Sequence, residues 1–293
     1  MKAANVERLL ARFRVEEGKG FRLAKHDPAD LGGTKLTKEA APDLLRQGVE
    51  RLSVLQDMLY AQDRWSVLCI FQAMDAAGKD GAIKHVFSGV NPQGCHVAAF
   101  KAPGPGELDQ DFLRRHVLQL PHRGMIGIHN RSWYEEVLVA RVHPDVLARQ
   151  KLPPGRVTKR IWEERLEDIA AFERYLARQG TVVLKFFLNV SQEEQRERFL
   201  SRIEEPEKNW KFSAADVAER RHWDAYMRCY EEAIRATAAP QAPWYVVPAD
   251  RKWFTRLVVV AAIIHALEGL KLHYPDVTES QRAALAEAKA ALG

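Results

Sequence analysis

The stretch from Trp65 to Gly81, WSVLCIFQAMDAAGKDG, constrains the fold more than any other part of the sequence. It opens with an apolar run at residues 67–71, which is short enough to be a strand buried on both faces. A loop of small residues follows, and Gly78 and Lys79 then lead into the first turns of a helix. A strand, a tight loop and a helix in this order direct backbone N–H groups and the positive end of the helix dipole at one point. Because Lys79 adds a full positive charge there, the stretch predicts a phosphate-binding loop.

The loop matches the P-loop pattern G-x-x-x-x-G-K-S/T only in part, since Ala73 replaces the first glycine and Asp80 the final hydroxyl residue. A carboxylate at Asp80 can still hold Mg²⁺, although it would repel a phosphate unless a metal lay between them. Asp75, inside the loop, is a second candidate metal ligand. In the alternative, a plain strand-to-helix turn, Gly78 supplies only an unusual backbone conformation and Lys79 is solvated. The backbone predicted to surround the phosphate is that of Ala76, Ala77 and Gly78.

Composition limits the class of partner and the compartment. The chain has 293 residues, a net charge of +5 and a pI near 9.1, which favours an acidic partner such as a nucleotide, a polyanion or nucleic acid. The three cysteines form no C-x-x-C pair, so we expect a reducing compartment and no structural zinc. The N-terminus lacks the apolar core of a signal peptide, and the longest apolar run, residues 257–267, is too short to span a bilayer. A cytoplasmic protein with no membrane partner is the expectation.

Apolar strands alternate with helical segments along the chain, and this alternation predicts one α/β domain with a parallel sheet covered on both faces. The fold class is a P-loop kinase-like, three-layer α/β/α arrangement with a helical lid. The predicted domains are an N-terminal arm at 1–38, mostly irregular, a catalytic domain at 39–275 that includes a lid at about 191–213, and a helical tail at 276–293. The five predicted strands are 66–71, 95–100, 125–129, 181–190 and 244–247. The main predicted helices are 42–62, 107–118, 137–142, 158–178, a helix capped by Ser191, 213–237 and 254–270.

Open parallel sheets bind ligands at the carboxyl ends of their strands. The third predicted strand ends at Asn130-Arg131-Ser132, on the same edge as the glycine loop. An arginine placed there presents a planar fork to two phosphate oxygens. The alternative is a surface ion pair between Arg131 and Glu135 or Glu136.

A group of basic residues follows the fourth strand, on the helix capped by Ser191 and the segment after it. Arg198 and Arg202 are four residues apart and share one helical face. Pro206 breaks the helix, and interleaved glutamates make an ordinary solvated helix the alternative. Beside a phosphate-binding sheet, the same group predicts a mobile lid that clamps a transferring phosphoryl group. Its candidate residues are Arg196, Arg198, Arg202, Lys208 and Lys211.

Three motifs in this order carry a family resemblance: residues 71–81, residues 130–134 (NRSWY), and the segment from Arg202 to Phe212 that contains NWKF. Together they resemble the polyphosphate kinase 2 family, over roughly residues 35–270. The resemblance implies a thymidylate-kinase-like core and a kinase that exchanges phosphate between inorganic polyphosphate and nucleotides. The family tolerates both Ala73 and Asp80 at their departures from the P-loop pattern. Where its commoner third-strand motif begins with Asp, this chain has Asn130, which resembles the subgroup accepting both nucleoside mono- and diphosphates.

The resemblance also implies residue roles. Asp75, helped by Asp80, would bind Mg²⁺, with Mn²⁺ as a substitute. Lys79 and Arg131 would hold the transferring phosphate, and Asn130 would lie beside it. The lid residues that grip polyphosphate would be Arg198, Arg202, Lys208 and Lys211. A homodimer or homotetramer is implied, with adenine or guanine nucleotides as partners.

Two other functions stay open at this point. One is an ATP-dependent nucleotide kinase of thymidylate-kinase type. The other is a non-enzymatic module that binds nucleotides or nucleic acid, although no aromatic residues are interleaved with the basic ones as stacking platforms, so nucleic acid is not an expected partner. Trp133 and Tyr134 are candidates for contact with a nucleotide base, with core packing as the alternative for both.

Overall fold

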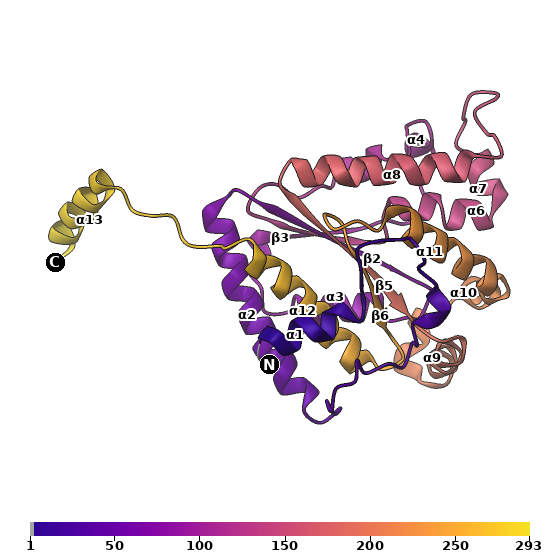
Figure 1. Ribbon diagram of the computed structural model, residues 1–293, viewed down its shortest axis with the longest axis horizontal. Helices are drawn as coiled ribbons and strands as arrows, with labels where there is room; N and C mark the ends of the chain where they lie inside the picture. Colours follow the sequence, from indigo (N-terminus) through magenta and orange to yellow (C-terminus); the bar gives the residue numbers. More distant parts are fainter. Residues whose placement is uncertain (1–2) are drawn as a thin grey trace.

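The computed structural model describes residues 3–293 and contains one six-stranded sheet in the order β1-β6-β5-β2-β4-β3 (Figure 1). Strands β2 to β6 are parallel, and β2 lies at the centre, buried along its length until Ala73. Five of the six strands match the predicted ones closely. The strand bounds are β1 Arg14–Val15, β2 Ser66–Ala73, β3 Cys95–Ala99, β4 Ile126–Asn130, β5 Thr181–Asn189 and β6 Trp244–Pro248.

The prediction of five strands was wrong by one, because the N-terminal arm adds β1 antiparallel to the edge of β6. Its two residues are too few to give a periodic signal in the sequence. The arm contains helix α1 (Ala3–Ala11), and Leu9, Leu10 and Phe13 are buried in the main core. The arm therefore completes one face of the sheet. The domain boundaries at residues 38 and 275 stay predictions.

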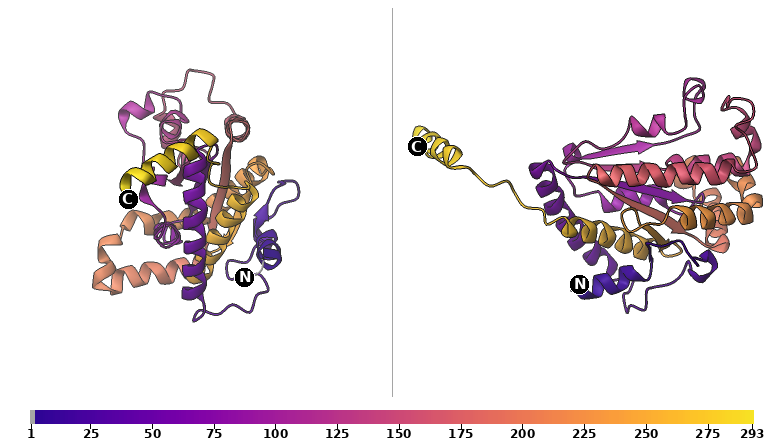
Figure 2. Two further views of the ribbon diagram at one scale, coloured as in Figure 1. Left: turned by 90° about the vertical axis from the view of Figure 1, so that its left-hand side faces the viewer. Right: turned by 45° about the horizontal axis from the view of Figure 1, so that its top comes forward.

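Helices cover both faces of the sheet, which confirms the three-layer α/β/α class. Helices α1, α2, α3 and α12 pack together on one face, and α6, α8 and α11 lie on the other (Figures 1 and 2). The tail helix α13 projects away from this body (Figure 1). No helix within residues 3–293 combines the length and the apolarity that crossing a bilayer requires. The longer helices are α2 Ala41–Gln62, α3 Lys79–Val86, α8 Ile161–Arg178, α9 Gln192–Glu204, α11 Trp223–Thr237, α12 Lys252–Gly269 and α13 Glu279–Leu292; the shorter ones are α4 Pro105–Leu108, α5 Arg114–Val117, α6 Val139–Val142, α7 Pro144–Ala148 and α10 Ala214–Glu219.

Two predicted helices are interrupted. The helix predicted at 107–118 is two short helices, α4 and α5, because the Asp111 side chain accepts a hydrogen bond from the Leu113 N–H at 2.9 Å and turns the chain. The helix predicted at 213–237 is divided into α10 and α11 by a 3₁₀ turn, η5 (Arg220–His222). Glu219, at the end of α10, accepts hydrogen bonds from His143 and Tyr226, which fix the direction in which the chain leaves the helix.

A buried polar network joins the sheet to the helices on the α8 side. The ammonium of Lys185, on β5, is fully buried and forms an ion pair with Glu173 of α8 at 2.5 Å. It also donates to the backbone carbonyl of Thr237 at 2.7 Å. Glu173 accepts hydrogen bonds from the Trp133 indole at 3.2 Å and the Tyr134 hydroxyl at 2.7 Å. Burial lowers the pKa of Lys185, whereas Glu173 raises it. The network anchors the segment that follows β4.

We predict that removing one partner of this ion pair costs more stability than neutralising both. Lys185→Met leaves the Glu173 carboxylate buried without a cation, which should cost about 3–5 kcal/mol of unfolding free energy. The double variant K185M/E173Q keeps acceptor and donor groups for Trp133 and Tyr134 and should be the more stable of the two. Urea denaturation of both variants measures the difference. A double variant less stable than K185M would contradict this account.

Candidate active site

The turn between β2 and α3 has the backbone geometry of an anion-binding loop. Ala76 and Gly78 adopt left-handed conformations, with φ of 60° and 102°. Residues in this region that alternate with right-handed ones direct successive N–H groups into one concavity. Gly78 caps helix α3, whose first N–H groups have no partner within the helix. The backbone conformation at position 78 therefore requires a glycine, as the plain-turn alternative supposed. The predicted phosphate-binding loop needs the same conformation, so the two alternatives agree on this point.

Helix α9, at the base of the lid, holds the loop from its outer side. The Gln195 side chain donates a hydrogen bond to the Asp75 carbonyl at 2.9 Å. The Arg198 guanidinium donates to the carbonyls of Ala76 and Ala77 at 3.0 and 2.7 Å. With three consecutive carbonyls bonded on this side, and the Ala77 N–H donating to the Met74 carbonyl at 3.2 Å, the loop is held in one conformation.

Three charged side chains meet at the mouth of the loop. The Arg131 guanidinium lies 3.3 Å from Asp75 and 3.3 Å from Glu135. Burial lowers the pKa of Lys79, and the nearby Arg131 lowers it further, whereas Glu135, Asp75 and Asp80 raise it. Burial raises the pKa of Asp75 against the opposing effect of Arg131 and Lys79. Two cations are thus held close together by carboxylates, an arrangement that a phosphate group would stabilise.

Arg131 stands in a strained backbone conformation, with φ of 68°, directly after β4. Its N–H donates to the Phe71 carbonyl at 3.0 Å, which fixes it to the central strand. A non-glycine residue in this region is uncommon and is enriched at functional sites. Of the alternatives for Arg131, the pair with Glu135 is present, but the same guanidinium also contacts Asp75 across the cleft. Glu136 instead pairs with buried Arg165.

The candidate metal ligands fit Mg²⁺ better than a metal held by protein groups alone. Within residues 3–293, no three His, Cys, Asp or Glu side chains come together to form a cage. Mg²⁺ is commonly bound by one or two carboxylates, with substrate phosphates and waters completing an octahedron. Asp75 lies in the loop, and Asp80 accepts a hydrogen bond from the Asn130 amide at 2.7 Å. Asn130 therefore orients a carboxylate, a role that the sequence did not indicate.

Trp133 does not occupy the position that base contact requires. Its side chain has no exposed surface, and its indole N–H donates to Glu173 inside the core. Tyr134 is equally buried. The prediction that Trp133 binds the nucleotide was wrong, and the core-packing alternative is the observed one, because the turn after β4 directs both aromatic rings away from the cleft.

Arg198 also differs from its predicted role as a lid residue that grips polyphosphate. It is only 7% exposed, and its donors are directed to backbone carbonyls of the loop and of Ala249 and Asp250. A guanidinium saturated in this way has no donor left for a ligand, so Arg198 positions the loop. The helical spacing correctly placed it on one face of α9 but did not show which way that face points.

The other lid cations lie at the surface of the lid, where each has a neighbouring partner. Arg202 pairs with Asp216 at 3.5 Å, and Lys208 pairs with Glu205 at 2.5 Å. Lys211 lies over the ring of Trp210, which is 78% exposed. These contacts match the solvated-helix alternative in this conformation. The predicted clamping role of Arg202, Lys208 and Lys211 stays a prediction.

Sequence reasoning missed two cations contributed by helix α12. Lys252 is near Arg198, Lys208 and Arg256, which lower its pKa after the larger effect of burial. The Arg256 guanidinium lies close to Gly81, at the start of α3: a Cβ added to Gly81 would be 4.0 Å from it. These residues extend the positive charge of the loop toward the lid. Only the fold reveals this, since α12 follows the last strand, far along the chain from the glycine loop.

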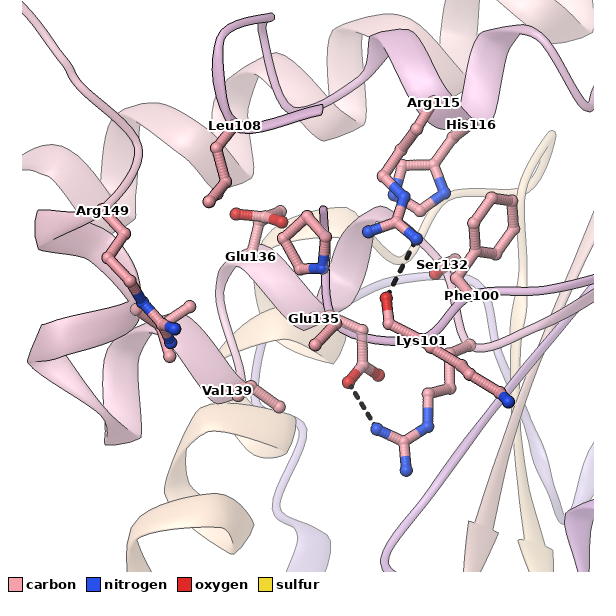
Figure 3. Close-up of a pocket in the computed structure, with 14 residues that line it drawn as sticks. Phe100, Lys101, Leu108, Arg115, His116, Ser132, Glu135, Glu136, Val139 and Arg149 are labelled. Carbon is pink, nitrogen blue, oxygen red and sulfur yellow. Dashed lines mark hydrogen bonds and ion pairs between the residues drawn. The ribbon is translucent and has the colours of Figure 1, made fainter. Parts of the chain in front are cut away.

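A cavity of about 130 Å³ adjoins Arg131 on the side away from the glycine loop, at the carboxyl ends of β3 and β4. Phe100 and Val139 contribute apolar walls, and Lys101, Arg115 and Glu135 contribute charge (Figure 3). Arg115 donates to the Lys101 carbonyl at 2.9 Å, which fixes one wall. The cavity therefore combines apolar walls with several charged groups at the carboxyl edge of the sheet, where open parallel sheets bind ligands.

The class of protein follows from this arrangement. A three-layer α/β/α fold, with a glycine loop after the central strand of its sheet and a helical lid, is a P-loop kinase-like α/β protein. A crystal structure of polyphosphate kinase 2 from Arthrobacter aurescens TC1 superimposes with a TM-score of 0.84 and 39% identity, covering 93% of this chain and 95% of that one.

Sequence comparison identifies the family. The sequence model of polyphosphate kinase 2 matches residues 35–275. An ADP-polyphosphate phosphotransferase of Rhodopseudomonas palustris is 52% identical over 92% of this chain and 93% of its own length. An AMP/ADP-polyphosphate phosphotransferase of Meiothermus ruber is 43% identical over 91% and 96%. The chain belongs to the polyphosphate kinase 2 family, as the three motifs had indicated.

Two buried histidines beside the cavity predict a loss of stability in acid. Burial lowers the pKa of His116 to about 3 and that of His129 to about 4, from ordinary values of 6.5. Between pH 6.5 and these lowered pKa values, the two histidines bind protons in the unfolded chain but not in the folded chain. The free energy of unfolding therefore falls as the pH falls below about 6.5. Each histidine contributes about 1.4 kcal/mol for each pH unit. His116→Gln should make this dependence shallower in denaturation series between pH 7 and pH 4. An unchanged slope would contradict the assignment.

We also predict that Arg198 cannot be replaced by lysine. Arg198→Lys keeps the charge but removes the fork, so several buried carbonyls lose their donors, at a cost of about 1–3 kcal/mol of unfolding free energy. Arg196→Lys on the same helix is the matched control, because Arg196 is exposed and pairs only with Glu193 and Glu197. Its expected effect is within about 0.5 kcal/mol. Equal stability of the two variants in urea would show that the loop does not depend on Arg198.

Proposed function

We propose that this protein is a polyphosphate-dependent nucleotide kinase, which transfers a phosphoryl group from inorganic polyphosphate to AMP or ADP and works in both directions. The observation that carries the proposal is that Lys79 and Arg131 lie near each other and near Asp75, at a loop with left-handed residues that leads into a helix N-terminus. The names of the relatives from Rhodopseudomonas palustris and Meiothermus ruber support the choice of substrates.

The two substrates would occupy opposite sides of Arg131. We place the acceptor nucleotide in the cavity lined by Phe100, Lys101 and Arg115, with its terminal phosphate at Arg131. Adenine and guanine both suit an apolar wall of this kind. We place the donor polyphosphate over the glycine loop and toward the lid, along Lys252, Arg256 and the lid cations Arg202, Lys208 and Lys211. Repeating negative charges require this kind of cationic path and no groups that read bases.

Phosphoryl transfer requires positioning and charge neutralisation more than covalent catalysis. The terminal phosphate oxygen of the nucleotide would attack the end phosphorus of polyphosphate in line. The P–O bond between this phosphorus and the next unit would break, and polyphosphate shorter by one unit would leave. Lys79 and the loop N–H groups would hold the equatorial oxygens of the transferring group, and Arg131 would release Asp75 to contact both phosphates. Arg198 and Gln195 would keep the loop in the form that receives them.

Mg²⁺ fits this site, with Asp75 and Asp80 as the residues that would hold it and Mn²⁺ as a substitute. The metal would neutralise charge on the phosphates between which the group moves. The raised pKa of Asp75 has burial as its main cause, and a cation beside it would favour the ionised form. Asn130 would keep Asp80 oriented through the amide hydrogen bond.

The setting of the enzyme follows from the same proposal. Its three free cysteines suit a reducing compartment, and we place it in the cytoplasm, where nucleotides and polyphosphate meet. Neither nucleic acid nor a membrane is part of the proposal. The homodimer or homotetramer implied by the family resemblance stays a prediction.

ATP formation from ADP and polyphosphate, with no ATP added, tests the proposal directly and separates it from an ATP-dependent kinase. The wild-type protein with Mg²⁺ should form ATP, and Lys79→Ala should lower the rate by about 10²–10³-fold through loss of transition-state charge stabilisation. Lys84→Ala is the matched control, because Lys84 is an exposed lysine on the same helix. It should keep the wild-type rate. Full activity in Lys79→Ala, or wild-type activity only with added ATP, would overturn the proposal.

A further inference from the structure

A second group of cations lies at the opposite edge of the sheet from the glycine loop. Arg64 lies two residues before β2, Arg123 precedes β4 and Arg178 ends the helix that precedes β5. These three strands are neighbours in the order β5-β2-β4 and run parallel, so their amino ends meet at one place. Strand β2 separates this place from the glycine loop by roughly 25 Å, given the rise per residue of a strand.

The three arginines line one shallow, open depression of the surface, together with Asp63, Trp65, Gln179 and Gly180. We name this depression the arginine basin. In the part of the chain that the structure describes, none of its three arginines forms an ion pair, and Asp63 is the one carboxylate in the lining. Other exposed arginines of the chain, such as Arg46, Arg160 and Arg196, do form ion pairs with neighbouring carboxylates. Three unpaired guanidinium groups in one concave surface leave an excess of positive charge.

The backbone under the basin is fixed rather than loose. The Gly124 N–H donates to the Trp65 carbonyl at 2.7 Å, and the Ser66 N–H donates to the Gly180 carbonyl at 3.1 Å. Gly180 has φ of 80°, and a Cβ there would lie 2.8 Å from the Arg123 guanidinium. Arg123 therefore lies directly over the Gly180 backbone, beside the Trp65 ring. The three turns are held together, so the arginines converge on the basin from a common base.

We infer that the arginine basin binds a segment of inorganic polyphosphate outside the active site. Guanidinium groups bind phosphate oxygens through planar, paired hydrogen bonds, and three of them around an open depression suit a flexible chain with a charge at every unit. The choice of polyphosphate rests on the proposed function, because a long donor chain held at the active site extends beyond it. A second contact would raise the affinity for long chains by effective concentration.

Short and long phosphate chains distinguish this site from the active site. One tripolyphosphate molecule is too short to contact both sites at once, whereas one long polyphosphate chain can engage both, so only the long chain gains affinity from the second contact. A nucleoside triphosphate carries the same phosphoanhydride groups, with Trp65 as a surface for its base, and is the other source of this chemistry. Titration calorimetry of the full chain with tripolyphosphate, long-chain polyphosphate and ATP therefore separates the alternatives without requiring turnover.

The test variant is R64Q/R123Q/R178Q, and the control is R8Q/R282Q/K289Q, which removes the same formal charge from exposed positions elsewhere. The test variant should bind long-chain polyphosphate about tenfold more weakly, with a shallower salt dependence. The affinity of the test variant for tripolyphosphate should stay within about twofold of the wild-type value. The affinities of the control variant for tripolyphosphate and for long-chain polyphosphate should do the same. If the triple variant does not fold, R64Q/R178Q keeps Arg123 over Gly180 and should give a smaller loss in the same direction.

Three results would overturn the inference: equal affinities of test and control variants for the long chain, a parallel loss of tripolyphosphate binding, or a loss confined to ATP. The last result would identify a nucleotide site instead. Failure of the wild-type protein to bind any phosphate chain would contradict the proposed function. Strong wild-type binding that is indifferent to the basin would contradict this inference alone.

Discussion

Repulsion between cations around one turn is the interaction on which the arrangement of the site depends. Burial lowers the pKa of Lys79, and the nearby Arg131 lowers it further. Asp75 and Glu135 hold Arg131 in place from either side of its guanidinium, and Glu135 raises the Arg131 pKa most. Such a site is stable with its carboxylates but favours an incoming polyanion, because phosphate oxygens supply more negative charge at shorter distance. The same electrostatic feature therefore accounts for the stability of the free site and for its affinity.

The glycine loop and the lid belong to one mechanical unit. Helix α9 bonds the loop carbonyls through Gln195 and Arg198 near its start and carries Arg202 toward its end. The loop and the predicted lid segment are therefore connected through one helix that is hydrogen-bonded to the loop. The buried network of Lys185 and Glu173 fixes the other wall, because it anchors the two aromatic residues that follow Arg131. The catalytic groups are thus positioned from two independent directions.

The sequence predicted the elements whose hydrophobic residues follow a strong periodic pattern, and it missed those that form only through tertiary contacts. The apolar runs gave five strands close to their observed bounds, whereas β1 was missed because two residues carry no period and the strand exists only by pairing with β6. The position of Asp75 and Lys79 at the turn between β2 and α3 could be predicted because adjacent residues encode the local geometry, whereas their roles stay predictions. Trp133 was misplaced, because sequence does not show which side of a turn a ring occupies. Lys252 was missed, because only the fold brings α12 to the loop.

The central claim is that one pocket, at the turn between β2 and α3, receives the end of a phosphate chain. A crystal structure of the protein with a short polyphosphate and Mg²⁺ tests this most directly. We expect the terminal phosphate within hydrogen-bonding distance of Lys79 and Arg131, with the metal on Asp75 and the chain continuing toward Lys252 and the lid. A phosphate chain bound elsewhere, with the turn unliganded, would contradict the account.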